Sequence, residues 1–195
     1  MNWKNLKNIK ELFRDKSRDN FYKILLDIGV DCELAKRGIN EEKLFNPWHR
    51  RSLGIININE DKPIKYVNII KQDGGKNNPP RWWYFFAIPS NDEIDKKDYI
   101  EVKSKRIKST PVIGKVESIE WEPNENSKKI SDNFSDDEEI NSLSMELGNI
   151  KVQSLHDNFS GFSVELEFKR RDKNINNQNW ESLNKIAHIC LNYKA

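Results

Sequence analysis

The sequence predicts an α+β domain: a largely antiparallel sheet of about seven strands, with N-terminal helices, one inserted helix and a C-terminal helix packed on it. Three observations lead to this fold class. Both ends of the chain carry apolar residues at helical spacing, and the middle carries strand-like runs. The connections between those runs are too short for helical crossovers, so neighbouring strands should be antiparallel. The length of 195 residues fits a single domain over 1–195.

The first 45 residues are the predicted helical N-terminal part. Two amphipathic helices are expected there, because apolar residues recur every three or four positions. They carry Trp3, Leu6, Ile9 and Phe13, then Phe21, Ile24, Leu25 and Ile28. Residues 31–38 are expected to add a short helical turn.

From residue 53 the pattern changes to strands. Five are predicted, with the sequences LGIININ, IKYVNII, RWWYFFAI, YIEVKSKRI and VIGKVESIEW. Turn-forming residues separate them, as in DGGKNNPP. The polar segment 122–135 that follows is predicted to be an acidic surface loop.

The last third of the chain predicts a helix, two strands and a second helix. Residues 135–138, SDDE, have the spacing of a capping box, and Gly148 closes the helix. The strands are NIKVQSLH and GFSVELEF, and the final helix begins near Asn179. The buried stripes of the two helices are Ile140, Leu143 and Leu147, then Trp180, Leu183, Ile186, Ala187 and Cys190.

The stretch PPRWWYFFAIP, residues 79–89, places five aromatic rings in one strand. Alternation puts Trp82, Tyr84 and Phe86 on one side, with Trp83, Phe85 and Ile88 near the other. An antiparallel strand that is apolar on both sides is typical of the centre of a covered sheet. We therefore expect most of these rings to be packed in the core.

The alternative role for this run is a stacking surface for single-stranded nucleic acid. Its residues would be Arg81, Trp82, Tyr84, Phe86, Lys103, Lys105 and Arg106. The segments WHRR at 48–51 and KRRDK at 169–173 add positive charge. Against this role, the 33 basic and 31 acidic residues give a net charge of only +2.

A second alternative is catalytic. Asp92 followed by Glu101-Val102-Lys103 resembles the Asp…Glu-x-Lys pattern of restriction-endonuclease-like nucleases. The resemblance implies that the two carboxylates hold Mg²⁺ and that the lysine helps to activate water. It covers only residues 92–103, and the segment that follows predicts a strand where that family would have a helix.

The residue pattern gives little support for a metal site, a cofactor site or a reactive cysteine. The three histidines have no metal-ligand spacing, and no phosphate-binding loop or nucleotide fingerprint is present, so we expect neither a metal site nor a cofactor. Cys32 and Cys190 are expected to be free thiols in a reduced cytoplasmic setting, with one disulfide between them as the alternative. No apolar run is long enough to span a membrane.

These observations favour a non-catalytic cytoplasmic binding protein. Its partner would be a protein, or a small apolar ligand held between the sheet and its helices. Nucleic-acid binding and Mg²⁺-dependent nuclease activity through Asp92, Glu101 and Lys103 are the two alternatives.

Overall fold

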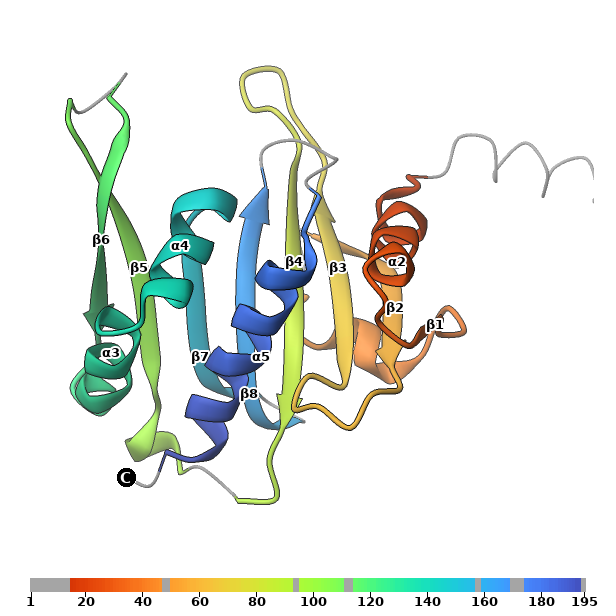
Figure 1. Cartoon of the computed structure of the whole chain (residues 1–195). Helices are drawn as coiled ribbons and strands as arrows, with labels where there is room; N and C mark the ends of the chain where they lie inside the picture. The colour runs from red at the N-terminus through yellow and green to blue at the C-terminus, as the bar shows by residue number, and fades with distance from the viewer. Residues whose placement is uncertain are drawn as a thin grey trace, which may run out of the picture.

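The computed structural model describes residues 15–46, 50–92, 95–110, 114–156, 159–168 and 174–193. Within these ranges eight strands form one open antiparallel sheet in the order β1-β2-β3-β4-β8-β7-β5-β6 (Figure 1). The strands are β1 (Cys32–Leu34), β2 (Arg51–Ile58), β3 (Tyr66–Gln72), β4 (Arg81–Pro89), β5 (Glu101–Lys108), β6 (Val116–Pro123), β7 (Ile150–His156) and β8 (Phe159–Phe168). The helices are α2 (Ser17–Asp27), α3 (Lys128–Ser135), α4 (Glu138–Leu147) and α5 (Asn177–Leu191), with 3₁₀ turns η1 (Asn40–Lys43) and η2 (Lys96–Asp98). The predicted α+β class and antiparallel sheet are confirmed.

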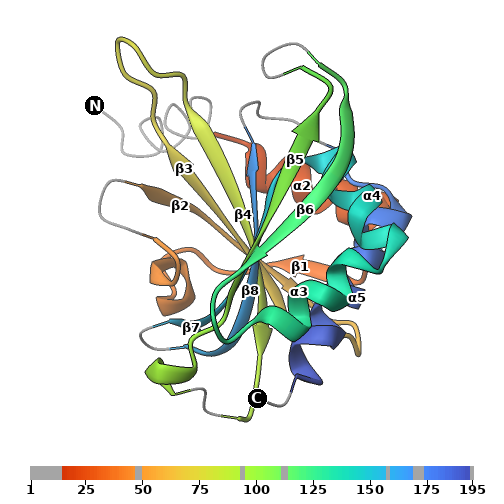
Figure 2. The same cartoon turned by 90° about the vertical axis from the view of Figure 1, so that its left-hand side faces the viewer.

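All four helices cover the same side of the sheet, and η1 lies on the other (Figure 2). The large hydrophobic core fills the space between the helices and the sheet, from Phe21 of α2 to Trp121 of β6. The opposite side, which we call the open face, has a much smaller buried cluster of Ile70, Trp83 and Phe85. The two sides of the sheet are therefore unequal.

Strand β4 lies in the middle of the sheet, as its two-sided apolar pattern predicts. It pairs with β3 from Tyr66↔Ala87 to Gln72↔Arg81, and with β8 from Trp82↔Phe168 to Pro89↔Gly161. Its residues 82 to 88 are all buried. Ile88, which we expected near Trp83, instead belongs to the helix side, because side chains alternate strictly along the strand.

Helix α5 crosses the sheet and buries the stripe that the sequence predicts. Trp180, Leu183, Ile186, Ala187 and Cys190 are all fully buried. A capping box formed by Asn176 and Asn179 begins the helix. Lys185 pairs with Asp137 and Glu139 and so joins α5 to the start of α4.

Three local predictions are wrong. Residues 128–135 of the expected loop form α3, because Ile130 and Phe134 lie one turn apart and bury against β6. Helix α4 is capped by Asp137, whose carboxylate accepts hydrogen bonds from the backbone N–H groups of Glu139 and Ile140, since residue 135 ends α3. Within the segment 31–38, residues 32–34 form β1 rather than a helical turn, because they pair with the edge of β2.

Two further expectations concern the ends of the chain and the cysteines. The first predicted helix, which carries Trp3, Leu6, Ile9 and Phe13, lies outside the described residues. Cys32 and Cys190 are both free and buried, and burial raises the pKa of the Cys190 thiol to about 12.

In the described part of the chain, no helix has the length and apolarity needed to cross a bilayer.

Candidate functional site

The three rings of the predicted stacking surface face the helices. Trp82, Tyr84 and Phe86 are at most 6% exposed. The Tyr84 ring lies 4.6 Å from Phe21 of α2 and 4.8 Å from Phe168 of β8, edge to face, and the Phe86 ring lies 6.4 Å from Trp180 of α5. These rings are core residues, so the expectation that the run is packed is confirmed. They form no exposed stacking surface in this structure.

The open face holds the other half of the aromatic run. Trp83 and Phe85 stand beside Ile70 of β3, and Phe45 packs on this cluster. The Phe45 ring lies parallel to the Phe85 ring at 5.1 Å, and Phe159 contacts Phe45 edge to face at 5.8 Å. We call Ile70, Trp83 and Phe85 the aromatic island. Sequence reasoning missed Phe45, because a single ring outside any periodic run gives no signal.

A segment that contains η1 covers this island from the solvent side. The buried amide of Asn68 donates to the carbonyl oxygen of Leu44 at 2.9 Å, and its oxygen accepts from the Ser52 hydroxyl at 2.8 Å. The Arg50 guanidinium carbon lies 3.6 Å from the centre of the Trp83 ring, within cation–π range. Burial lowers the pKa of Arg50, although the charges of Glu165 and Glu167 act in the opposite direction.

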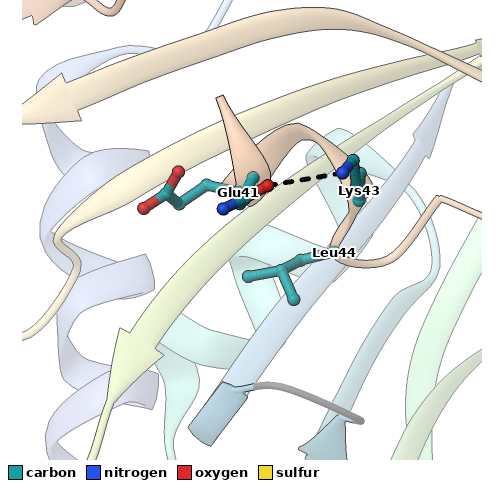
Figure 3. A pocket seen from close by; sticks show the side chains of 4 residues that line it. Glu41, Lys43 and Leu44 are labelled. Carbon is teal, nitrogen blue, oxygen red and sulfur yellow. Dashed lines mark hydrogen bonds between the residues drawn. The ribbon is translucent and has the colours of Figure 1, made fainter. Parts of the chain in front are cut away.

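A hollow of about 460 Å³ adjoins this covering segment (Figure 3). Among the described residues its lining is Asn40, Glu41, Lys43 and Leu44. The Lys43 ammonium donates to the Asn40 side-chain oxygen at 3.3 Å, so two of the lining residues are hydrogen-bonded to each other (Figure 3). The hollow is a surface feature beside η1, on the side of the sheet away from the helices.

The other half of the open face, over β8, β7, β5 and β6, carries a row of charges. The Glu101 carboxylate lies 2.6 Å from the Lys103 ammonium and 2.9 Å from the Lys151 ammonium, and it accepts a 2.9 Å hydrogen bond from the Tyr99 hydroxyl. Burial alone would raise the pKa of Glu101, but these hydrogen bonds outweigh it and lower the pKa to about 2. We call this row the charged half.

Glu165 lies where the island and the charged half meet. It stands opposite Phe85 on β4 and opposite Lys151 on β7. Burial raises the pKa of its carboxyl group, although the nearby charges of Lys151 and Arg50 act in the opposite direction. Within the described part of the chain, no hydrogen bond to this carboxylate is found. The alternation in GFSVELEF puts Glu165 on the side away from the apolar residues, but it does not identify the neighbours across the strands.

The basic residues predicted for nucleic-acid binding already have partners. Arg81 lies 2.9 Å from Glu167, Lys103 pairs with Glu101, and Lys105 lies 3.2 Å from Glu122. Arg106 donates to the side-chain oxygen of Asn149 at 3.2 Å. Paired in this way, these four side chains do not form a continuous positive surface. Trp48 and His49 of WHRR and the whole of KRRDK lie outside the described residues.

The predicted nuclease residues are only partly brought together. Glu101 and Lys103 share one side of β5, as the spacing predicts. Asp92 is exposed in the segment after β4, and two strands stand between β4 and β5 in the sheet. Among the described residues, no group of three or more His, Cys, Asp or Glu side chains is arranged to hold a metal ion.

Comparisons with protein-family models, with curated proteins and with solved structures found no match to this chain.

Proposed function

We propose that this chain is a non-catalytic cytoplasmic binding protein whose partner is a protein segment that docks on the open face of the sheet. The observation that carries the proposal is the inequality of the two sides. One side is covered by helices, whereas on the other a short segment around Phe45 covers the aromatic rings, which lie beside a half-buried carboxylate and a row of charges. Aromatic anchors surrounded by polar groups are typical of protein-binding surfaces.

The balance of charge supports a protein partner over nucleic acid. A polyanion is bound by cations that are free to neutralise phosphates. On the open face, Arg81, Lys103 and Lys105 each have a carboxylate within 3.2 Å. A protein segment, which carries charges of both signs, fits such a mixed surface better.

A small apolar ligand between the sheet and the helices has less support. Tyr84, Phe86, Trp180 and Leu183 line that space and are at most 2% exposed. Protein interiors of this kind are close-packed, so a ligand there would have to displace side chains.

The proposal is tested by selecting displayed random peptides on the wild-type protein and measuring their affinity for two variants. Lys151→Met removes a charge from the open face and keeps the aliphatic stem. Lys23→Met makes the same change at an exposed position of α2. We expect the affinity of selected peptides for Lys151→Met to change by at least about tenfold, a difference of about 1.4 kcal/mol, and their affinity for Lys23→Met to stay unchanged. Equal binding to all three proteins would place the site elsewhere.

Two cheap measurements address the alternatives. Retention on a single-stranded DNA column that falls steeply with salt would favour the nucleic-acid alternative. Mg²⁺-dependent nicking of DNA that disappears in Glu101→Ala would favour the nuclease, whereas we expect no nicking by either protein. Coordination of Mg²⁺ by Glu101 would also require its bonds to Lys103 and Lys151 to break.

A further inference from the structure

Residues 39–46, which we call the strap, cover the aromatic island without belonging to any strand or long helix. Figure 2 shows η1, in orange, on the side of the sheet that faces away from the four helices. The strap has few backbone bonds of its own, such as Leu44 N–H to Glu41 O at 3.2 Å and Asn46 N–H to Lys43 O at 3.3 Å. Two side chains bind it to the sheet: Asn68 donates to the Leu44 carbonyl oxygen, and the amide oxygen of Asn46 accepts from the backbone N–H of Ser52 at 3.3 Å. A segment held this way can open without disturbing the sheet.

Phe45 is the strained point of the strap. Its φ angle is +62°, and it is the only non-glycine residue with positive φ among the described residues. A bulky aromatic residue rarely adopts this left-handed conformation, and such strain persists only where surrounding contacts enforce it. Here the enforcing contact is the ring itself, which lies flat on Phe85.

The Phe45 ring fills a slot that has the shape of an aromatic binding site. Phe85 supplies the floor, parallel to the ring at an interplanar angle of 6°, and Phe159 supplies a wall at 71°. Glu165 stands directly across the strand pair from Phe85. An aromatic side chain in this slot would therefore have a carboxylate beside it that accepts no hydrogen bond from the described residues, although the charges of Lys151 and Arg50 act on it.

We propose that Phe45 is a displaceable occupant of this slot, and that the partner is an extended peptide which inserts an aromatic side chain flanked by Lys or Arg. The strap is then an autoinhibitory contact: the partner competes with Phe45 for Phe85 and pairs its basic residue with Glu165. This inference rests on the proposed function and specifies its partner. The backbone strain at Phe45 is relieved when the strap leaves the sheet, which favours replacement of the Phe45 ring by the aromatic ring of the partner.

The test uses Phe45→Gly, because glycine accepts the positive φ while removing the ring. The probe is the peptide acetyl-Lys-Phe-Lys-amide, with acetyl-Lys-Ser-Lys-amide as the control, and binding is followed by the NMR shifts of the Phe85 amide and the Trp83 indole. We expect the Phe peptide to bind the variant at least about tenfold more tightly than wild type, and the Ser peptide to bind neither. Leu34→Ala, which trims a side chain that is 38% exposed, should match wild type. No gain of affinity in Phe45→Gly overturns the proposal.

Hydrogen exchange on the wild-type protein gives a second test that needs no variant. We expect the Leu44 and Asn46 amides to exchange at least about 100-fold faster than those of Val67 and Phe86 in the central strands. Equal protection would show that the strap opens only when the whole protein unfolds, and the proposal would fail. The proposed function can fail separately, since that test compares Lys151→Met with wild type and leaves Phe45 in place.

Discussion

Glu101 shows how one residue of the open face is held charged. Its side chain is 22% exposed and lies between two ammonium groups and a tyrosine hydroxyl. Because the folded pKa is about 2 and the ordinary value is 4.5, the carboxylate stabilises the fold above about pH 4.5. That stability is lost as the pH falls from about 4.5 to about 2.

This leads to a prediction for Glu101→Gln. The variant should be less stable than wild type at pH 7, by on the order of 1 kcal/mol, since partly exposed ion pairs contribute no more than about that. The difference should shrink toward zero as the pH is lowered to about 2. Urea unfolding of both proteins at a series of pH values measures it. A difference that stays constant with pH would mean that Glu101 acts through packing rather than charge.

The same residue marks the limit of sequence reasoning at this scale. That Glu101 and Lys103 share a side follows from strand alternation alone. That Lys151 is the second partner does not, because the pairing of β5 with β7 joins segments separated by two helices. Local spacing predicts neighbours along a strand, whereas neighbours across strands depend on the order of the sheet.

At the scale of elements, α5 provides the first test of the core. Leu183 is fully buried in the stripe that faces the sheet. We expect Leu183→Ala to lower the free energy of unfolding by about 2–5 kcal/mol, the usual cost of removing a buried leucine side chain. The matched control is Gln178→Ala at an exposed position of the same helix, with an expected change within about 0.5 kcal/mol. If both variants lose the same stability in urea unfolding, α5 is not docked as described.

The junction of β4 and β8 provides a second element-scale test at Gly161. This residue has a φ of +141°, and a Cβ atom there would lie 2.1 Å from the backbone oxygen of Ile88. Gly161→Ala must therefore move one strand or the other, at a cost on the order of 1–3 kcal/mol or more. Gly75→Ala, where nothing lies within 4 Å, should change stability by less than about 0.5 kcal/mol. Thermal unfolding of Gly161→Ala and Gly75→Ala measures this difference in stability. Similar melting temperatures would contradict the close approach of Gly161 to the backbone of Ile88.

Most elements follow from local pattern, and the exceptions have physical reasons. The apolar residues on both sides of β4 predict a central strand. The alternating apolar and polar residues of β8 predict a strand with one buried side. Helix α3 was missed because only Ile130 and Phe134 are apolar in its eight residues, so tertiary contact with β6 stabilises it more than periodicity does. The strap and Phe45 were missed because their cover of Phe85 is non-local. The open face could therefore be identified as a candidate site only from the folded structure.

Across the whole molecule, the helix side and the open face contribute unequally to the core. The core on the helix side runs without interruption from Cys32 on β1 to Trp121 on β6, so it joins both edges of the sheet. The open face adds only a small cluster and leaves its remaining side chains to ion pairs. Stability thus comes mainly from the helix side, and for this reason we propose the other side as the binding surface.

A continuous core predicts that the sheet unfolds as one cooperative unit. Trp82 lies on the central strand β4, where its indole N–H donates to Asp15 just before α2. Trp121 lies under α3 at the β6 edge of that core, while Trp83 reports on the open face. With fluorinated tryptophan, the ¹⁹F signals of Trp82 and Trp121 should disappear at the same urea concentration. Trp83 should show an earlier shift in chemical environment if the strap opens first, before its signal is lost with the others. Loss of the Trp121 signal well before that of Trp82 would instead divide the molecule into two separately folding halves, and the open face would then span a boundary rather than a single rigid sheet.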